Sequence, residues 1–399
     1  MTKLLDLKNN SVIAINQNNY TKEDNYKKVC YLDTDNITNN RINAFLKIDL
    51  TKEKLPSRAK RKCSLNSIIY SSVRPNQRHF GIIKEIPKNF LVSTAFIVID
   101  IIDLEKLDPN YLYYYITQDK ITHYLQRIAE CGTSSYPSIT PLDFLNIKIK
   151  LYPLETQQKI AHTLSVLDQK IENNHKINEL LHKILELLYE QYFVRFDFLD
   201  ENNKPYQTSG GKMKFSKKLN RLIPSGWSVR FLNHKIVSTY QPKTISKTLL
   251  NDSYSYSVYG GGGIIGRFTE YNHEQSEFII SCRGQCGISY LTLPKSWITG
   301  NAMVIRPTKS YTSKTYLYHT IKKYKLTNYI TGSVQPQITR QNLSTMPILI
   351  PKRKTLNKWN NISSLLWNLI HNNMQSTQTL TALRDFLLPL LLKQQVKPQ

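Results

Sequence analysis

The run Glu155–Arg195, which reads ETQQKIAHTLSVLDQKIENNHKINELLHKILELLYEQYFVR, contains neither glycine nor proline. Mostly apolar residues recur along it at alternating spacings of four and three, which is the period of a helix that buries a single seam. The seam positions are Ile160, Leu164, Leu167, Ile171, Asn174, Asn178, Leu181, Leu185, Leu188 and Tyr192. The run therefore predicts one long helix, a rod of about 60 Å if roughly forty residues each rise about 1.5 Å.

A second run near the end of the chain repeats this spacing. Its seam positions are Trp359, Ile362, Leu366, Leu369, Asn373, Ser376, Leu380, Leu383, Leu387 and Leu390. Both seams are apolar at their ends and polar in the middle, and polar seam residues cost stability but fix register and partner. We therefore expect the two helices to pair as an antiparallel coiled coil whose polar layers meet. The alternative is that each helix packs only on its own globular unit.

The sequence before each helical run occurs twice, about 199 residues apart. Residues 134–140 read SSYPSIT, and residues 334–339 read VQPQIT. An apolar run, a proline and the helical pattern follow in both copies. We expect an α/β (α+β) protein with a pseudo-twofold internal repeat, built as a first globular unit (1–154), a central helix (155–199), a second globular unit (200–354) and a distal helix (355–399).

The charge of the chain is strongly positive and unevenly spread. The formal net charge is +25, with +7 in residues 1–154, −2 in 155–199, +17 in 200–354 and +3 in 355–399. A basic protein of this kind favours a polyanionic partner. The positive charge lies mainly in the two globular units, which indicates two basic surfaces and a spacer rather than a basic tail.

Local patterns predict the elements of each unit. In the first unit, residues 67–73 and 96–99 are expected as strands and 112–127 as a helix. Thr140 is expected to cap a short helix that begins at Pro141 with Asp143 in its first turn, and Thr339 repeats the cap. In the second unit, residues 200–222 are expected as a loop, 278–281, 288–291 and 303–305 as strands, and 316–323 as a helix.

Several segments of the first unit carry side chains suited to double-stranded DNA. Lysine and arginine contact phosphates, whereas arginine, asparagine and glutamine also match base edges. The predicted DNA-binding residues are Arg58, Lys60 and Arg61 in a basic cluster, Ser72, Arg74, Asn76 and Arg78 after a strand, and Ser134 and Tyr136 in the repeated turn. For any single arginine or lysine, a solvated surface charge is the alternative.

The second unit offers a similar set in similar places. Arg283 and Gln285 follow the strand 278–281, and a glycine-rich loop at 260–263 could let the backbone approach a phosphate. The predicted DNA-binding residues here are Gly262, Arg267, Arg283, Gln285, Ser333 and Gln335. Two strand-end loops with related positions argue for DNA contact more strongly than one.

Other kinds of chemistry find little support. Residues 261–266 resemble a phosphate-binding loop but lack its lysine and its Ser or Thr. Cys282 and Cys286 have no second ligand pair, so we expect no metal site, and the scattered cysteines indicate reduced thiols and a cytoplasmic protein. No apolar run approaches the roughly 20 residues of a membrane span. We expect no catalytic residues.

The ordered set of motifs closely resembles the DNA-specificity subunits of type I restriction-modification systems. The match covers nearly the whole chain, and the linear order agrees. The residues that carry it are 56–61, 71–76 and 92–96 in the first unit, 155–161, 167–174 and 188–198 in the central helix, 223–227 and 259–266 in the second unit, and 380–385 and 387–389 in the distal helix.

This resemblance implies a role and a set of partners. Such subunits bind a bipartite double-stranded DNA target, one half-site per recognition unit, and the helices act as a ruler. Two modification subunits dock around them and methylate adenine with S-adenosylmethionine, and restriction subunits add ATP- and Mg-dependent translocation and cleavage. The resemblance thus places these cofactors on the partners and none on this chain.

Two other interpretations stay open at this point. The chain could be a specificity fragment of a fused methyltransferase-nuclease, or a stand-alone coiled-coil DNA-binding adaptor. A methyltransferase reading frame beside this one, or co-purification of a methyltransferase subunit, distinguishes them from the specificity subunit.

Overall fold

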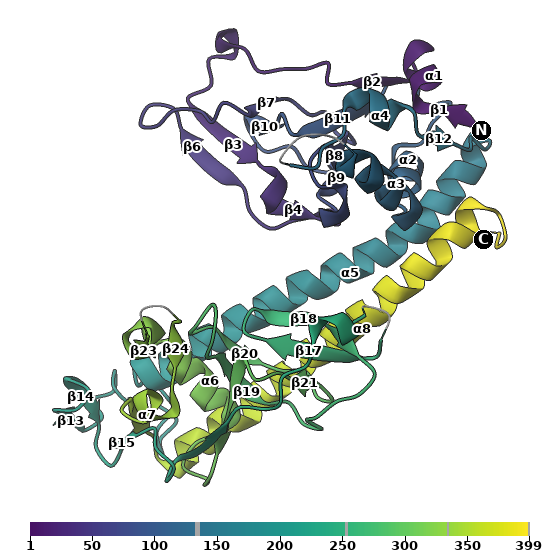
Figure 1. The fold of residues 1–399 in the computed structure, drawn as a ribbon. Coiled ribbons are helices and arrows are strands. Elements are labelled where there is room, and N and C mark those ends of the chain that lie inside the picture. Colours follow the sequence, from purple (N-terminus) through teal and green to yellow (C-terminus); the bar gives the residue numbers. More distant parts are fainter. Residues whose placement is uncertain (132–135, 252–253, 333–334, 398–399) are drawn as a thin grey trace. The chain divides into compact units, whose positions relative to one another are not determined.

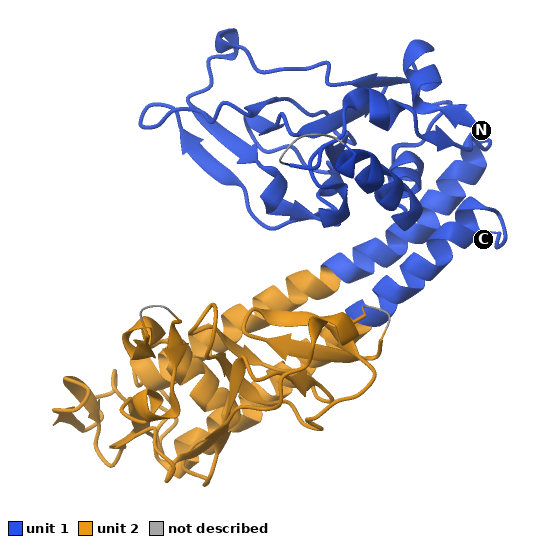
Figure 2. Ribbon diagram, viewed as in Figure 1, with its two compact units in different colours: residues 1–172, 377–399 blue, residues 173–376 orange. Residues whose placement is uncertain are grey.

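The structure is a computed structural model that describes residues 1–131, 136–251, 254–332 and 335–397. The chain divides into two compact units, each of which contains part of both long helices (Figure 2). Unit 1 comprises Met1–Glu172 and Thr377–Gln399, and unit 2 comprises Asn173–Ser376. Strands and helices mix in both units (Figure 1), which confirms the predicted α/β class.

Unit 1 is built on two four-stranded sheets, with strand orders β6-β3-β10-β7 and β2-β11-β8-β9. Only the β3–β10 pair in these sheets is parallel. The strands are β1 Thr2–Lys3, β2 Ile13–Ile15, β3 Lys28–Leu32, β4 Ile37–Thr38, β5 Arg41–Ile42, β6 Leu46–Asp49, β7 Ala59–Arg61, β8 Ile68–Ser71, β9 Phe80–Ile82, β10 Phe90–Ser93, β11 Phe96–Ile101 and β12 Lys148–Ile149. The two predicted strands of this unit are therefore present as β8 and β11.

Short helices cover the second of these sheets. They are α1 Leu4–Asn9, α2 Pro109–Ile116, α3 Asp119–Glu130 and α4 Pro141–Leu145. The single helix predicted at 112–127 is wrong, because the chain breaks between α2 and α3. The Thr117 hydroxyl donates to the Tyr113 carbonyl at 2.8 Å, and the Gln118 amide donates to the Tyr115 carbonyl at 2.7 Å. These side chains satisfy the last carbonyls of α2 and end it.

Unit 2 follows the same plan with a four-stranded sheet of order β16-β22-β19-β20 and a three-stranded sheet of order β18-β17-β21. Its strands are β13 Met213–Ser216, β14 Arg221–Pro224, β15 Ser228–Phe231, β16 Val237–Tyr240, β17 Tyr256–Gly260, β18 Gly263–Phe268, β19 Phe278–Ser281, β20 Ser289–Leu291, β21 Trp297–Ile298, β22 Ala302–Pro307, β23 Ile330–Thr331, β24 Gln337–Ile338 and β25 Pro347–Ile350. The loop predicted at 200–222 is wrong in part, because β13 pairs with β14 as a hairpin. Each of these strands has only four residues, MKFS and RLIP, so the alternation of apolar and polar residues is too short to predict a strand.

Both units repeat the cap that precedes each apolar run. Thr140 accepts a hydrogen bond from the Asp143 amide at the start of α4, and Thr339 accepts one from the Asn342 amide at the start of α7 (Arg340–Leu343). Each cap satisfies an amide that the helix itself leaves without a partner. The predicted caps are confirmed.

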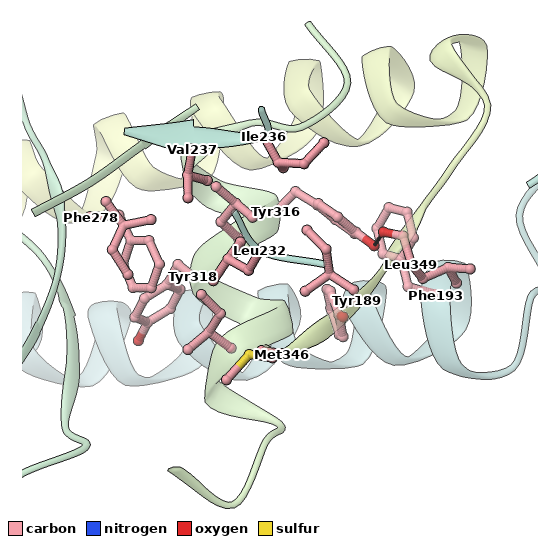
Figure 3. Packing of buried hydrophobic residues seen from close by; sticks show 14 of the residues in the cluster. Tyr189, Phe193, Leu232, Ile236, Val237, Phe278, Tyr316, Tyr318, Met346 and Leu349 are labelled. Atoms are coloured by element: carbon pink, nitrogen blue, oxygen red, sulfur yellow. Dashed lines mark hydrogen bonds between the residues drawn. The ribbon is translucent and has the colours of Figure 1, made fainter. Parts of the chain in front are cut away.

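The core of unit 2 is dominated by aromatic rings. Tyr316 of helix α6 (Lys314–Lys322) lies 4.7 Å from Phe193, measured between ring centroids, and packs toward Tyr189 (Figure 3). Strand residues such as Val237 and Phe278 close the cluster from the sheet side. Because the ends of both long helices contribute to this cluster, the sheet, α6 and the helices share one core.

The two long helices are α5 Leu154–Tyr189 and α8 Arg353–Leu392. A π-helical turn, Glu190–Val194, continues α5 and buries Tyr192 and Phe193. Helix α8 contains Pro389 near its end. Each helix runs from one unit into the other (Figure 2).

Within each unit the two helices lie antiparallel. In unit 1 the Tyr152 hydroxyl donates to the Leu392 carbonyl, and Arg384 is paired with Asp168. In unit 2 the Asn373 amide donates to the Asn178 side-chain oxygen at 2.9 Å, and His182 lies against Trp367. In both units, residues further along the chain in α5, or just before it, contact residues earlier in α8, as expected of antiparallel helices. The polar layers therefore meet through Asn178 and Asn373, as the seam pattern predicts.

The seam on α5 lies where the pattern places it. Ile160, Leu164 and Leu185 are fully buried, and Leu167, Ile171, Asn174, Asn178 and Leu181 are partly buried. On α8, Leu366, Asn373, Leu380 and Leu387 are partly buried, but Leu369 and Leu383 are exposed by 51% and 43%. The buried face of α8 in unit 2 runs one residue later, through Ser363, Trp367 and Ile370. Leucines on two faces of this helix made the register ambiguous from sequence.

Candidate nucleic-acid interface

In unit 1, three chain segments meet where β8 ends. The Ser72 amide donates to the Ala95 carbonyl at 2.8 Å, and the Ile139 amide donates to the Ser72 carbonyl at 2.8 Å. Val73 also forms an antiparallel bridge with Ser138. We call residues 72–74, 94–95 and 136–138 reading edge 1. The repeated turn is thereby fixed beside the end of the strand.

Unit 2 repeats these two backbone bonds and the bridge. The Cys282 amide donates to the Asn301 carbonyl at 3.0 Å, and the Ile338 amide donates to the Cys282 carbonyl at 3.0 Å. Arg283 forms an antiparallel bridge with Gln337. Residues 282–285, 300–301 and 335–337 form reading edge 2. The bonds make Cys282, Arg283 and Gly284 the counterparts of Ser72, Val73 and Arg74.

Reading edge 1 presents an arginine stacked on an aromatic ring. The Arg74 guanidinium carbon lies 5.3 Å from the centroid of the Tyr136 ring, and this ring is 62% exposed. The Ser72 hydroxyl is occupied differently, because it donates to the Ala95 carbonyl. Arg74 is thus the residue of this edge whose side chain is both cationic and held beside an exposed ring.

The basic cluster adjoins reading edge 1 through backbone bonds. The Thr94 amide donates to the Arg58 carbonyl at 2.8 Å, so β7 begins beside the 94–95 turn. Arg58 and Lys60 are exposed and suit phosphate contacts. Arg61 differs, since burial lowers the pKa of its guanidinium and its Nε has no hydrogen-bond partner within the described residues.

Two predicted residues of unit 1 are tied to helix α3 instead of the edge. Arg78 pairs with Asp119 at 2.9 Å, and the Asn76 backbone amide donates to the Gln126 side chain at 3.1 Å. An arginine already paired with a carboxylate must give up that partner to bind a phosphate or a base. The structure therefore brings Arg58, Lys60, Ser72, Arg74 and Tyr136 together and leaves Asn76 and Arg78 apart.

Reading edge 2 is joined by the glycine-rich turn between β17 and β18. A Cβ atom built on Gly261 would lie 2.9 Å from the Arg283 carbonyl oxygen, so only glycine allows this approach. Gly262, Arg283 and Gln285 are all exposed here. Arg267 lies on β18, where its guanidinium donates to the Ser255 carbonyl.

The repeated turns complete both edges only in part. Gln335 occupies the place of Tyr136 and is exposed. Ser134 and Ser333 lie outside the described residues. Sequence reasoning missed Asn301 and Gln337, which are exposed on edge 2. The echo of Ser138-Ile139 by Gln337-Ile338 was the signal for Gln337, whereas Asn301 stands in a turn that no motif marks.

The described parts of the chain hold no metal-binding cluster, no disulfide and no membrane-spanning helix. Among these residues, no group of three or more His, Cys, Asp or Glu side chains is placed to hold a metal ion. The five cysteines form no disulfide. None of the described helices combines the length and apolar character needed to cross a membrane.

Two α/β units of one design, each with a polar strand-end edge and joined by paired helices, define a DNA-recognition protein with two recognition units. The chain belongs to the family of type I restriction modification DNA specificity domains, whose model matches residues 6–183 and 224–383. The two matched segments fall on the two repeats, as the 199-residue echo predicts.

Known relatives are similar in sequence or in fold. The HindI specificity subunit of a type I restriction enzyme from Haemophilus influenzae is 32% identical over 173 residues, 43% of this chain and 37% of that subunit. The MjaIX specificity subunit from Methanocaldococcus jannaschii is 24% identical over 73% of this chain and 70% of that subunit. The crystal structure of a type I restriction-modification S subunit from M. genitalium shares the fold, with a TM-score of 0.57, 16% identity and coverage of 98% and 95% of the two chains.

Proposed function

We propose that this chain gives a type I restriction-modification complex its DNA sequence specificity, with one half of a bipartite target read by each unit. The observation that carries the proposal is the pair of reading edges. The two edges share two backbone hydrogen bonds and one antiparallel bridge, but Gly284 and Gln335 on edge 2 stand at the places of Arg74 and Tyr136 on edge 1. A common frame with different side chains suits two different half-sites.

The uneven charge supports a duplex partner. Residues 200–354 carry a net charge of +17 and residues 1–154 carry +7. Phosphate contacts supply affinity without sequence information, and base contacts supply the choice of sequence. Covalent linkage of the two units also raises the effective concentration of the second half-site once the first is bound.

The long helices offer one apolar stripe each for a modification subunit. On α5, Ile177, Leu180, Ile184 and Leu187 are exposed by 46%, 61%, 44% and 61%. The 199-residue offset places Leu383 and Phe386 of α8, exposed by 43% and 65%, at the positions of Ile184 and Leu187. The same offset places Ser376 and Thr379 at the positions of Ile177 and Leu180, so only this apolar pair repeats. A repeated apolar pair suits two copies of one partner, whose own bound S-adenosylmethionine would supply the methyl group. Restriction subunits with ATP and Mg complete the proposed assembly.

Methylome sequencing of cells that express the chain with its modification subunit tests the recognition role. We expect a bipartite methylated sequence, and we expect Arg74→Ala and Arg283→Ala to relax one half-site each. Loss of both half-sites in either single variant contradicts the assignment of one half-site to each unit. Absence of any sequence-specific methylation contradicts the function itself.

Native mass spectrometry tests the docking role. Leu187→Glu and Phe386→Glu should each remove one of two modification subunits from the complex, because a buried charge at the stripe is costly. Asn357→Glu, at an exposed position of α8 away from the stripes, is the control. Two bound modification subunits in both stripe variants would contradict docking on the stripes.

A further inference from the structure

Arg74 stands in a backbone conformation that rarely accepts a side chain. Its φ is +47° and its ψ is +66°, in the left-handed region. Outside glycine, asparagine and aspartate, such a conformation is strained and persists only where the surrounding structure imposes it. Here the bridge from Val73 to Ser138 and the bond from the Arg74 amide to the Pro137 carbonyl, 2.8 Å long, hold the backbone in place.

Unit 2 shows what the same frame does without that side chain. The counterpart of Arg74 is Gly284, which also has a left-handed φ, of +73°. Glycine adopts this region without strain. The frame therefore requires a left-handed residue at this place in both units, and unit 1 keeps an arginine there despite the strain. Arg78 is also left-handed, with a φ of +57°, so this conformation points to a role for the Arg74 side chain only together with the place of Arg74 on reading edge 1.

The Arg74 side chain is also positioned in advance. Its guanidinium stacks over Tyr136 at 5.3 Å, and no carboxylate of the described residues lies within ion-pair distance of it. The other arginine after this strand, Arg78, is already paired with Asp119. A guanidinium held by a ring keeps its donor fork free and loses less conformational freedom when it binds.

We infer that Arg74 reads a guanine in the half-site bound by unit 1, and that Tyr136 is the positioning residue that holds its guanidinium for this contact. The inference rests on the proposed function and adds the base and the residue that reads it. A planar fork of N–H donors matches the O6 and N7 acceptors of guanine in the major groove, and no other base offers that pair. A phosphate contact is the alternative, and it would be blind to sequence.

The test uses the complete modification complex and duplexes that carry its methylome-defined target. Each G·C pair of the first half-site is replaced in turn by A·T. We expect wild type to lose roughly 10- to 100-fold in affinity at one such pair. Arg74→Gly should lose this discrimination, whereas Arg74→Lys should keep part of it because an ammonium can also donate to guanine. Arg74→Gly removes the backbone strain, so an unchanged or higher Tm shows that the fold persists.

Variants of Tyr136 distinguish a positioning residue from one that contacts the base itself. Tyr136→Ala should weaken binding severalfold while the preferred base stays the same, and Tyr136→Phe, which keeps the ring, should restore most of the affinity. Arg127→Gln, which removes an exposed arginine of α3 in the same unit, controls for lost charge.

The outcomes distinguish the inference from the function on which it rests. A bipartite target whose first half-site keeps its G·C preference in Arg74→Gly overturns the inference alone. Uniform weakening on every duplex with a smaller salt dependence identifies a phosphate contact and also overturns it. Failure of the wild-type complex to recognise any bipartite sequence overturns the proposed function.

Discussion

The helix that joins each recognition unit to the long helices begins alike in both units. Helix α2 carries Tyr111-Leu112-Tyr113, and α6 carries Tyr316-Leu317-Tyr318. The Tyr111 hydroxyl donates to the Lys150 carbonyl at 2.5 Å, and the Tyr316 hydroxyl donates to the Leu349 carbonyl at 2.6 Å. These bonds tie the helix to the apolar run before α5 in unit 1 and before α8 in unit 2. The shared part is the attachment of the helix.

The next residue of each helix meets a different environment. In unit 1, Tyr114 donates to Asp168 at 2.6 Å, and Arg384 donates to the same carboxylate at 2.8 Å. In unit 2 the corresponding residue is His319, whose ring stacks on Tyr189 and lies 5.3 Å from Trp359. The 199-residue offset places Trp367 at the position of Asp168. One frame thus tolerates either a charged network or an aromatic cluster, and the two should respond differently to mutation and to acid.

Removal of a ring from the unit 2 cluster should have the largest effect. Trp359 is 1% exposed and contacts Tyr189, Phe193 and His319. Trp359→Ala should destabilise unit 2 by about 3–5 kcal/mol, because the lost packing leaves a cavity. Hydrogen exchange should show faster opening of β19 and β22 amides with little change in β8 and β11. Equal acceleration in the two sheets would mean that the units do not unfold separately.

Low pH should give the second largest effect, and it should destabilise unit 2 more than unit 1. Burial, with Lys322 as a lesser cause, lowers the pKa of His319 from 6.5 to about 3, and burial lowers that of His371 to about 4. At a pH between the lowered pKa of each histidine and its ordinary value of 6.5, the unfolded chain binds more protons than the folded chain. Unit 2 therefore loses stability as the pH falls below about 6.5. His319 alone should cost about 2–3 kcal/mol by pH 4.5. Tyr114, its counterpart, carries a raised pKa and does not titrate there.

His319→Phe provides the check on this acid response. The variant keeps an aromatic ring at the position but has no group to protonate. Urea unfolding of unit 2, followed by hydrogen exchange at pH 7 and pH 4.5, should show a smaller acid loss than in wild type. An identical loss in the variant would assign the acid response to other groups.

The charged network of unit 1 should give a smaller effect. Both side chains of the Arg384–Asp168 pair are about four-fifths buried, at 22% and 21% exposure. Asp168→Asn should cost about 1–2 kcal/mol, less than loss of a fully buried pair, because Arg384 keeps Asp385 as a partner. Glu155→Gln, which breaks the exposed pair with Lys159, should change the unfolding free energy by under about 0.5 kcal/mol. Equal losses in the two variants would show that the network adds no more than a surface pair.

The parts of the fold that sequence predicts are those in which one period dominates. The α5 seam and the Thr140 and Thr339 caps follow from local spacing, and the structure shows them where they were expected. Helix α8 has leucines on two faces, so spacing alone placed the seam one residue early at Leu369. The break between α2 and α3 depends on Thr117 and Gln118 hydrogen bonds that no hydrophobic period records.

The sequence predicts the separate loops of the candidate interface, but it does not predict that these loops lie together at one edge. Strand ends and repeated turns marked Arg74, Tyr136 and Arg283. Their convergence depends on backbone bonds between segments that are distant in sequence, such as the one from Cys282 to Asn301. The pairing of Arg78 with Asp119 is also tertiary, and it removes from the edge a residue that sequence could not distinguish from Arg74.

The polar layer between the helices should affect stability less than the charged network does. In unit 2 the Asn373 amide donates to Asn178, and the Asn178 amide donates to the Ile370 carbonyl at 3.3 Å. Asn178→Leu or Asn373→Leu alone should cost about 1 kcal/mol, because the remaining amide loses its partner in a partly buried site. The double variant should regain that loss or exceed wild type, since an all-apolar layer carries no desolvation cost.

A double-mutant cycle on the unfolding free energy measures the coupling, which should be about 0.5–1 kcal/mol. Additive losses would mean that the two amides do not act as a pair. If the layer fixes register and partner, the double leucine variant should also gain stability at the expense of specificity. Sedimentation should then detect more self-association in the double variant than in wild type. A double variant that stays monomeric would show that the polar layer has no role in partner choice. The pairing of the two helices in unit 2 would then be attributed to its aromatic cluster.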